Sequence, residues 1–260
     1  MPTALITGAS SGIGAAFAHA LGQRRYDLVL VARREERLKA VAEQSRALGA
    51  GRVEIMSCDL SHTSAPTELQ ARIAGANLTV DFLINNAGFG TTGCFHRMPL
   101  ERELEQIELN VLALVSLTRL LLPAMLARGS GTIINVASTA AFQPVPYMST
   151  YAATKAFVLS FTEGLACEVA GRGVRLLALC PGPVRTEFQS VAGNESPLVP
   201  SFAYMDADAV VSQALAAVER GRVVRINGAM NSVMAYAARL FPRAIVRAIA
   251  GRIYRNAAQP

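Results

Sequence analysis

The fold is decided by one stretch near the start of the chain, Ala4-Leu5-Ile6-Thr7-Gly8-Ala9-Ser10-Ser11-Gly12-Ile13-Gly14. Its apolar beginning is typical of a buried strand, and its glycines have the spacing G-x-x-x-G-x-G ahead of a helical pattern. Glycine lets the backbone turn sharply, and the N-terminus of a helix offers free N–H groups to an anion. Taken alone, such a turn also follows ordinary buried strands. In a doubly wound sheet it predicts a dinucleotide-binding loop made by Gly8, Ser10, Ser11, Gly12, Ile13 and Gly14.

Short apolar runs alternate with longer helical patterns along the rest of the chain. The runs expected to form strands are 4–7, 27–32, 53–57, 80–85, 131–137, 174–179 and 222–227, and the helical patterns include 35–48, 102–128, 150–170 and 206–219. Most of the runs lack polar alternation, which is typical of strands covered on both faces. We therefore predict an α/β protein, a three-layer doubly wound Rossmann fold with a mostly parallel seven-stranded sheet. Residues 1–260 are expected to form one domain with a C-terminal helical extension.

Composition excludes several classes of protein. With 52% hydrophobic and 17% charged residues, the chain is too apolar for a disordered protein. Three scattered histidines and four widely spaced cysteines without a CxxC pair favour neither a metal site nor a histidine-based triad, and the cysteines are typical of free thiols in a reducing compartment. The first strand pattern begins at once, leaving no room for a signal peptide, so a cytoplasmic location is expected. The most apolar stretch, 111–125, is interrupted by Ser116, Thr118 and Arg119, which argues against a membrane span.

Positive charge is concentrated at the C-terminal end of the chain. Residues 220–260 contain eight arginines and no acid, whereas the preceding residues hold 17 Lys+Arg and 19 Asp+Glu. A general nucleic-acid-binding surface is therefore not indicated.

The end of the second strand pattern indicates which dinucleotide binds. A carboxylate at that place would hold the ribose hydroxyls of NAD, whereas arginine accommodates the 2′-phosphate of NADP. The run ends in Arg33 and Arg34, with no acid before Glu35. Two solvated arginines at a strand end are the alternative. The missing acid favours NADP(H), with Arg33 and Arg34 as phosphate ligands.

Candidate catalytic residues follow the fifth strand pattern. Ser138 stands at its end, and Tyr151 and Lys155 come thirteen and seventeen residues later, spaced to share one face of a helix. A tyrosine has a pKa of about 10, and a nearby ammonium is expected to lower it, which suits proton transfer to a reduced carbonyl. The alternative is an ordinary amphipathic helix on which these two residues have no catalytic role. The chain has only two lysines, so a lysine at this position is suggestive.

Together these motifs resemble the short-chain dehydrogenase/reductase family over nearly the whole chain up to about Asn227. Further matching motifs follow in family order: Asp59-Leu60, Asn85-Asn86-Ala87-Gly88, Leu109-Asn110-Val111, and Pro181-Gly182-Pro183-Val184 with Thr186. The resemblance implies an Asn110-Ser138-Tyr151-Lys155 tetrad. In that tetrad Tyr151 is the acid/base, Lys155 lowers its pKa and binds the nicotinamide ribose, Ser138 orients the substrate oxygen and Asn110 relays protons.

The resemblance also implies cofactor contacts and an assembly. Asp59 and Leu60 would contact adenine, and Asn86, Ala87 and Gly88 would border the cofactor. Pro181, Gly182, Val184 and Thr186 would face the nicotinamide. The family's alternative basic position is Ser11 here, which leaves the 2′-phosphate mainly to Arg33. Family members commonly form homodimers or homotetramers through helices corresponding to 102–128 and 150–170, and we expect the same.

A mostly apolar set of residues is expected to border the substrate: Phe142, Val145, Tyr147, Met148, Phe188, Leu198, Phe202, Tyr204 and Met205. Residues 187–205 contain no cation, and about 186–205 would form a lid over the substrate. An apolar ketone, aldehyde or alcohol therefore fits better than a small carboxylate. Alternatively, several of these residues only pack the lid and do not contact the substrate.

The basic tail, about 229–256, has two amphipathic helical patterns separated by Pro242. Such a helix usually packs on its own protein or on a neighbouring subunit, which is the favoured interpretation. Contact with an anionic membrane is the alternative.

Three candidate functions follow from the whole sequence: an NADP(H)-dependent carbonyl or alcohol oxidoreductase, a membrane-associated lipid or 3-oxoacyl reductase, and a non-catalytic NADP(H) sensor. The complete tetrad argues against the sensor.

Overall fold

The computed structural model describes residues 1–193 and 204–254 and contains one seven-stranded sheet. Its strands are β1 (Thr3–Thr7), β2 (Asp27–Ala32), β3 (Val53–Ser57), β4 (Val80–Asn85), β5 (Gly131–Val136), β6 (Val174–Cys180) and β7 (Val224–Ile226). They lie in the order β3-β2-β1-β4-β5-β6-β7, and all six pairs are parallel. The expected fold class is confirmed. The chain order reverses between β1 and β4, where ligands bind in open α/β sheets.

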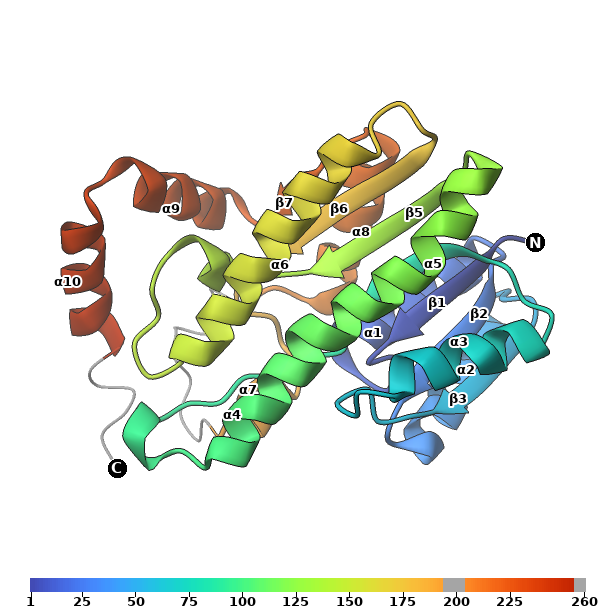
Figure 1. Cartoon of the computed structure of the whole chain (residues 1–260), viewed down its shortest axis with the longest axis horizontal. Helices are drawn as coiled ribbons and strands as arrows, with labels where there is room; N and C mark the ends of the chain where they lie inside the picture. Colours follow the sequence, from blue (N-terminus) through green and yellow to red (C-terminus); the bar gives the residue numbers. More distant parts are fainter. Residues whose placement is uncertain (194–203, 255–260) are drawn as a thin grey trace.

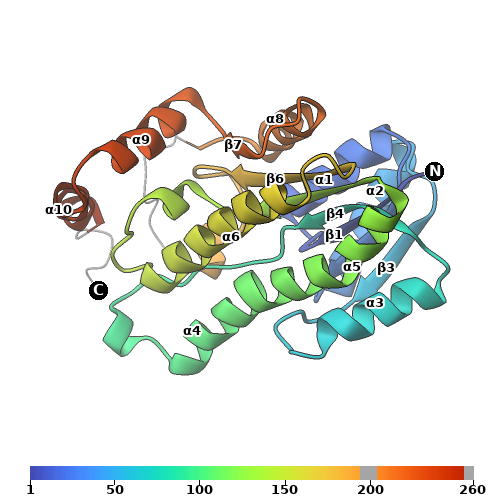
Figure 2. The same ribbon diagram turned by 45° about the horizontal axis from the view of Figure 1, so that its top comes forward.

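Helices cover both faces of the sheet and make three layers (Figures 1 and 2). One face carries α1 (Gly12–Gln23), α2 (Glu35–Ala47) and α8 (Ala207–Glu219). The other carries α3 (Ala65–Gly75), α4 (Leu100–Ile107), α5 (Leu114–Arg128) and α6 (Ser149–Glu168). Three short helical segments lie near the carboxyl ends of the strands: η1 (Phe95–Arg97), η3 (Thr139–Phe142) and α7 (Phe188–Val191).

Strand periodicity distributes the apolar side chains between two cores. Ala4 and Ile6 of β1 belong to the cluster that includes Phe17 of α1, whereas Leu5 between them belongs to the cluster that includes Leu117 of α5. Successive side chains of a strand point to opposite faces, so an unbroken apolar run is what a doubly covered strand needs.

The longest helical stretch runs from Leu100 to Arg128, two residues longer at its start than expected, and contains a π-helical segment, η2 (Glu108–Ala113). By length and composition it is the one described helix that could cross a membrane. Leu117 and Met125 of α5 are fully buried in the sheet's core, so this helix is a layer of the fold.

A ladder of buried polar side chains ties the helical layer to the sheet. Asn85 Nδ2 donates to Asn135 Oδ1 at 2.9 Å and to Thr118 Oγ1 of α5 at 3.1 Å. Asn135 Nδ2 donates in turn to Thr162 Oγ1 of α6 at 2.9 Å. Because buried amides are costly without partners, these bonds fix the positions of α5 and α6 over β4 and β5.

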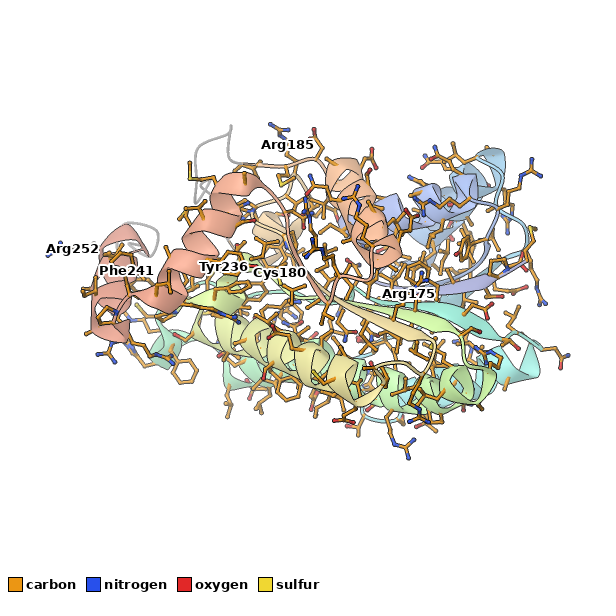
Figure 3. All side chains as sticks on the ribbon, turned by 90° about the horizontal axis from the view of Figure 1, so that it is seen from above. Arg175, Cys180, Arg185, Tyr236, Phe241 and Arg252 are labelled. Atoms are coloured by element: carbon orange, nitrogen blue, oxygen red, sulfur yellow. The ribbon has the colours of Figure 1, made fainter. Side chains whose placement is uncertain are left out.

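The tail forms α9 (Ala229–Leu240) and α10 (Arg243–Tyr254), which project from the edge of the sheet beyond β7. Figure 3 shows Phe241 and Arg252 at the end farthest from the strands. β7 is shorter than the expected 222–227 strand. The other expected strands and the helices before the tail agree with the observed ones to within two residues at each end.

Two expectations fall partly outside the described residues. Of the expected lid, 194–203 lie outside them, with Leu198 and Phe202, as do 255 and 256 of the tail.

Candidate active site

A cleft of about 420 Å³ opens at the carboxyl ends of β1 and β4. Almost all the expected site residues line it: Gly8, Ser10, Ser11, Gly12, Ile13, Arg33, Arg34, Asp59, Leu60, Asn86, Ala87, Gly88, Ser138, Tyr151, Lys155, Pro181, Gly182, Val184 and Thr186. Gly14 and Asn110 are not part of its wall. Segments far apart in the chain therefore meet where the order of the sheet reverses.

The glycine loop needs its glycines for two different reasons. Gly8 and Gly12 have φ values of 65° and 56°, in the left-handed region that side chains disfavour. Gly14 lies in the first turn of α1, where a Cβ would overlap the carbonyl of Gly8. Gly14 thus lets α1 pack against the loop and is not itself exposed to the cleft.

Thr7 and Asn86 fasten the loop to β4. The Thr7 hydroxyl accepts hydrogen bonds from the backbone N–H groups of Asn86 and Ala87, both at 2.9 Å. The Asn86 amide donates back to the Thr7 carbonyl at 2.9 Å. These bonds hold the loop rigidly on the inner wall of the cleft.

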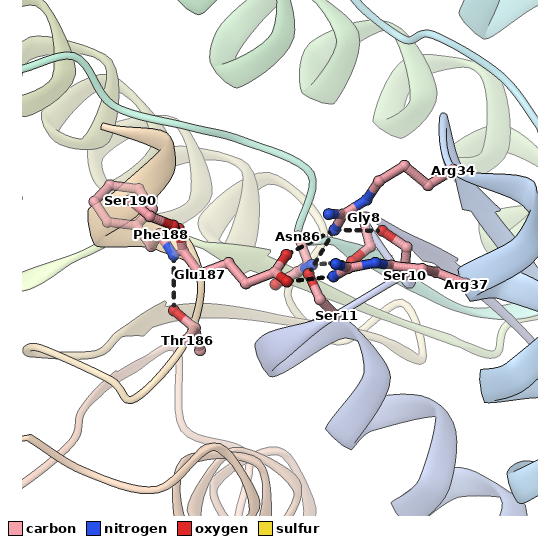
Figure 4. Close-up of polar contacts among 10 residues, drawn as sticks. All are labelled: Gly8, Ser10, Ser11, Arg34, Arg37, Asn86, Thr186, Glu187, Phe188 and Ser190. Atoms are coloured by element: carbon pink, nitrogen blue, oxygen red, sulfur yellow. Dashed lines mark hydrogen bonds and ion pairs between the residues drawn. The ribbon is translucent and has the colours of Figure 1, made fainter. Parts of the chain in front are cut away.

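An ionic cluster lies beside the glycine loop, at the end of the cleft where adenosine is expected (Figure 4). Arg34 Nη2 is 3.3 Å from Ser10 Oγ and 3.1 Å from Ser11 Oγ, and it pairs with Glu187 Oε2 at 2.9 Å. The other Glu187 oxygen pairs with Arg37. The two guanidinium groups hold the pKa of Glu187 below its usual value. Arginines and hydroxyls thus already surround a carboxylate there.

Arg33 points to a different set of partners. Its Nη1 lies 3.5 Å from Asp59 Oδ2 and 3.4 Å from Glu105 Oε1. Burial pushes the pKa of Asp59 up, but hydrogen bonds from Ser61 and the charge of Arg33 bring it below its usual value. Arg34 with Arg37 is therefore better placed for an anion than Arg33, which two carboxylates already neutralise.

Helix α6 places Tyr151 and Lys155 on the same wall, because residues four apart share a helix face. Both side chains are buried, at 9% and 5% exposure. Ser138 follows β5, and its hydroxyl accepts a 3.1 Å bond from the N–H of Ala140 in η3. Ser138 lies close enough to Tyr151 for its hydroxyl to act as a hydrogen-bond donor toward the phenol oxygen. The three side chains form one polar group in an apolar wall.

The pKa values of this group differ from the sequence expectation. Burial raises the pKa of Tyr151 to about 12, although the bond with Ser138 acts to lower it. Burial also lowers the pKa of Lys155 to about 8. The expected lowering of the tyrosine pKa by the ammonium is therefore wrong, because burial dominates and the lysine nitrogen lies 5.8 Å from the centre of the phenol ring.

Lys155 is held by the backbone, and the space around it is kept small. Its Nζ donates to the Val136 carbonyl at 2.8 Å. A Cβ on Gly88 would lie 3.5 Å from that nitrogen and 2.7 Å from Asn110 Oδ1. Gly88 therefore lets Asn110 and Lys155 pack closely against the backbone.

Asn110 lies in the π-helical segment and is buried behind the cleft. Its Nδ2 donates to the Phe89 carbonyl at 2.9 Å and to Thr154 Oγ1 at 3.1 Å, and its Oδ1 accepts from the N–H of Phe89. The side chain joins the long helix, the segment after β4 and α6. It positions Tyr151 and Lys155 through their own helix, and π-helical segments frequently occur at functional sites.

The expected substrate-side residues divide into two groups. Val145, Met148 and Phe188 line the cleft, and the rings of Phe188 and Tyr151 lie 5.2 Å apart. Phe142, Tyr147, Tyr204 and Met205 are not part of the lining, and their contact with a substrate stays a prediction. Phe142 lies under the Arg239 guanidinium at 5.0 Å, and Met205 bridges to Val184.

Sequence reasoning missed residues in and around the cleft. Arg37 and Glu187 complete the ionic cluster, and the only available signal was the position of Arg37 one helical turn after Arg34. Gly90 is another. A Cβ there would lie within about 3 Å of Phe188, Met148 and Tyr151, so the bare backbone lets these three side chains pack closely.

Comparisons with known proteins identify the family. The family model described as short chain dehydrogenase matches residues 2–196. The ketoacyl reductase HetN of Nostoc sp. is 37% identical over 182 residues, which cover 70% of this chain but 63% of that protein. A Streptomyces coelicolor protein described as a putative ketoacyl reductase is 36% identical over 185 residues, covering 70% of each chain. The chain thus spans less than two thirds of HetN.

Solved structures agree with the sequence relatives. A short-chain dehydrogenase from Sphingobium yanoikuyae in complex with NADPH has a TM-score of 0.82 and 36% identity, covering 92% of this chain and 94% of that one. A bulky-bulky ketone specific alcohol dehydrogenase from Comamonas testosteroni has a TM-score of 0.78 and 32% identity, covering 92% of both chains. The chain belongs to the short-chain dehydrogenase/reductase family, a family of oxidoreductases.

Proposed function

We propose that the protein is an NADP(H)-dependent oxidoreductase that interconverts a ketone or aldehyde and an alcohol. One observation carries the proposal: the buried side chains of Ser138, Tyr151 and Lys155 meet at one end of a cleft, and at its other end two arginines hold the carboxylate of Glu187.

The residues of the cleft fit a phosphorylated dinucleotide. The glycine loop and the start of α1 would hold the diphosphate, since their glycines leave backbone N–H groups accessible. Arg34, Arg37 and the hydroxyls of Ser10 and Ser11 would bind the 2′-phosphate, because they already surround the Glu187 carboxylate. NADPH, when bound, supplies a hydride. Lys155 would hold the nicotinamide ribose, and Val184 and Thr186 the carboxamide.

The proton chemistry belongs to the buried group. Ser138 orients the substrate oxygen by a hydrogen bond, and Tyr151 gives its proton to that oxygen as the carbonyl is reduced. A pKa of about 12 keeps Tyr151 protonated at neutral pH, which suits the donor role in reduction. Lys155, with a pKa of about 8, is still mostly protonated at pH 7. Asn110 acts as a positioning residue behind both.

An apolar substrate fits the reacting end best. Val145, Met148 and Phe188 provide apolar walls around Tyr151. The names of two similar proteins support this class, since one is a ketoacyl reductase and the other an alcohol dehydrogenase specific for bulky-bulky ketones. An apolar ketone with two sizeable substituents is the substrate class we propose.

We also propose a homodimer or homotetramer in the cytoplasm. Leu104, Leu112 and Phe157 expose apolar side chains on the long helix and on α6, and an assembly through these helices would cover them. The four cysteines are free thiols, as is usual in a reducing compartment.

The function is tested by following NADPH consumption with a panel of bulky ketones, small ketones, aldehydes, acyl thioesters and a short 2-oxo acid. We expect turnover of apolar ketones, weaker turnover of the 2-oxo acid and a preference for NADPH over NADH. Consumption of neither cofactor with any panel member, despite measurable NADPH binding, would favour a non-catalytic NADP(H)-binding protein.

A further inference from the structure

The arm formed by α9 and α10 leaves most of its large apolar side chains in solvent. Its exposed members are Met230, Val233, Met234, Tyr236, Leu240, Phe241, Ile245 and Ile249. Leu240 is 84% exposed and Met230 71%. Within α9 only Ala235 is buried, so the helix meets the rest of the fold over a narrow contact. Packing on its own domain, the favoured expectation, therefore leaves this apolar surface uncovered.

The exposed apolar residues form continuous stripes. Met230, Val233 and Met234 are spaced three and four residues apart on α9, and Ile245 and Ile249 are four apart on α10. Residues at these spacings share a helix face. Leu240 and Phe241 join the two stripes at the turn between the helices. An apolar surface this continuous on a globular protein marks an interaction site.

The charge of the arm is of one sign. Residues 220–260 contain eight arginines and no acid. Arg239 has one distant acidic neighbour, Glu163, at 3.9 Å. Arg243, Arg247 and Arg252 make no ion pair with any residue in 1–193 or 204–254. Exposed apolar stripes beside unpaired arginines are complementary to a surface that is apolar inside and negatively charged at its boundary.

We propose that the arm binds the surface of an anionic lipid bilayer. The apolar side chains of α9 and α10 would enter the headgroup boundary, and Arg243 and Arg247 would contact lipid phosphates. A second copy of the chain fits less well, because a symmetric contact between two arms would bring two acid-free, arginine-rich segments together.

The arm also borders the cleft. Asn231 in the first turn of α9 lies so close to Gly182 that a Cβ on that glycine would overlap it, and α9 packs on η3 just after Ser138. Binding through the arm therefore holds the cleft beside the lipid surface. The lipid contact itself does not depend on the reaction proposed above.

The test is co-sedimentation of the full chain with two kinds of vesicle, phosphatidylcholine alone and equal parts phosphatidylcholine and phosphatidylglycerol. We expect binding to the second kind that weakens with added salt. Arg243→Gln/Arg247→Gln removes two positive charges near the bilayer surface and should lower the partition coefficient about 30-fold. Leu240→Glu/Phe241→Glu should abolish binding. The matched controls Arg172→Gln/Arg175→Gln and Leu48→Glu, exposed and outside the arm, should bind normally.

Light scattering on the same variants separates the alternatives. If the arm binds lipid, the arm variants keep the oligomer size of the wild type. They also bind NADPH as the wild type does, and this binding shows that the variants are folded. Failure to bind anionic vesicles would overturn the proposal. An arm variant that only lowers the oligomer size would assign this surface to a second copy instead.

Discussion

The two ends of the cleft hold their polar groups in different ways. At the proposed catalytic end, Tyr151 and Lys155 are buried, Lys155 is bonded to the Val136 carbonyl, and Tyr151 lies beside Ser138. At the adenosine end, Arg34 and Glu187 are partly solvated and form ion pairs that a phosphate can replace. Buried polar groups allow few alternative arrangements, whereas exposed ion pairs contribute little and exchange easily. Changes at the first end should therefore affect the chemical step and changes at the second the choice and affinity of cofactor.

The largest expected effect is at the proton donor. Tyr151→Phe removes the hydroxyl and keeps the ring against Phe188, so the cleft should stay intact while turnover falls about a thousandfold. Steady-state kinetics with an apolar ketone measures this. Ser160→Ala, a change on the same helix but outside the cleft lining, is the control and should leave kcat within about twofold. Retained turnover in the phenylalanine variant would refute the assigned role.

The second largest effect is expected on the choice between NADPH and NADH, from a substitution at the other end of the cleft. Arg34→Gln removes one charge-assisted contact to the 2′-phosphate and should raise the Kd of NADPH about 10- to 100-fold, with little change for NADH. Fluorescence titration with both cofactors measures the two constants. Arg33→Gln is an informative companion, because Arg33 already faces Asp59 and Glu105 and should change the ratio less. A larger effect at Arg33 would assign the phosphate to that residue.

The rate of carbonyl reduction should fall as the pH rises through about 8. Burial lowers the pKa of Lys155 to about 8, so its proton is present below that pH and lost above it, while Tyr151 with a pKa of about 12 stays protonated. Above that point the rate should drop about tenfold per pH unit, if the charged lysine is needed. A profile of kcat with saturating NADPH shows it. A flat profile up to pH 10 would mean that the charge of Lys155 is not required.

The smallest effect is expected from the carboxylate in the anion site. Glu187→Gln removes the group that competes with phosphate for Arg34 and Arg37, so NADPH should bind up to about fivefold more tightly. The same titration measures it, with Glu36→Gln as a control that removes an exposed acid of α2 paired with Lys39. Weaker NADPH binding in Glu187→Gln would show that the carboxylate supports the cofactor site.

Local patterns predicted most of the fold and the catalytic end. The glycine loop, the unbroken apolar runs and the four-residue spacing of Tyr151 and Lys155 follow from strand and helix geometry, which depends on nearby residues alone. The resemblance to the family supplied Asn110 and the motifs after β3, β4 and β6.

What the sequence did not predict depends on contacts between distant segments. Glu187 meets Arg34 across 153 positions of the chain, and no local pattern indicates that pairing. Phe142 lies outside the cleft lining and under Arg239 of α9, 97 positions further along the chain. The raised pKa of Tyr151 depends on burial by several elements at once, which spacing cannot show.

The most direct test is a single-turnover measurement of hydride transfer at saturating NADPH in wild type, Tyr151→Phe and Arg34→Gln. Our account predicts that the first variant binds NADPH normally and transfers hydride about a thousandfold more slowly, whereas the second transfers hydride at nearly the wild-type rate once saturated. Normal hydride transfer in Tyr151→Phe, or an equal loss of transfer in both variants, would contradict the assignment of chemistry to one end of the cleft and cofactor choice to the other.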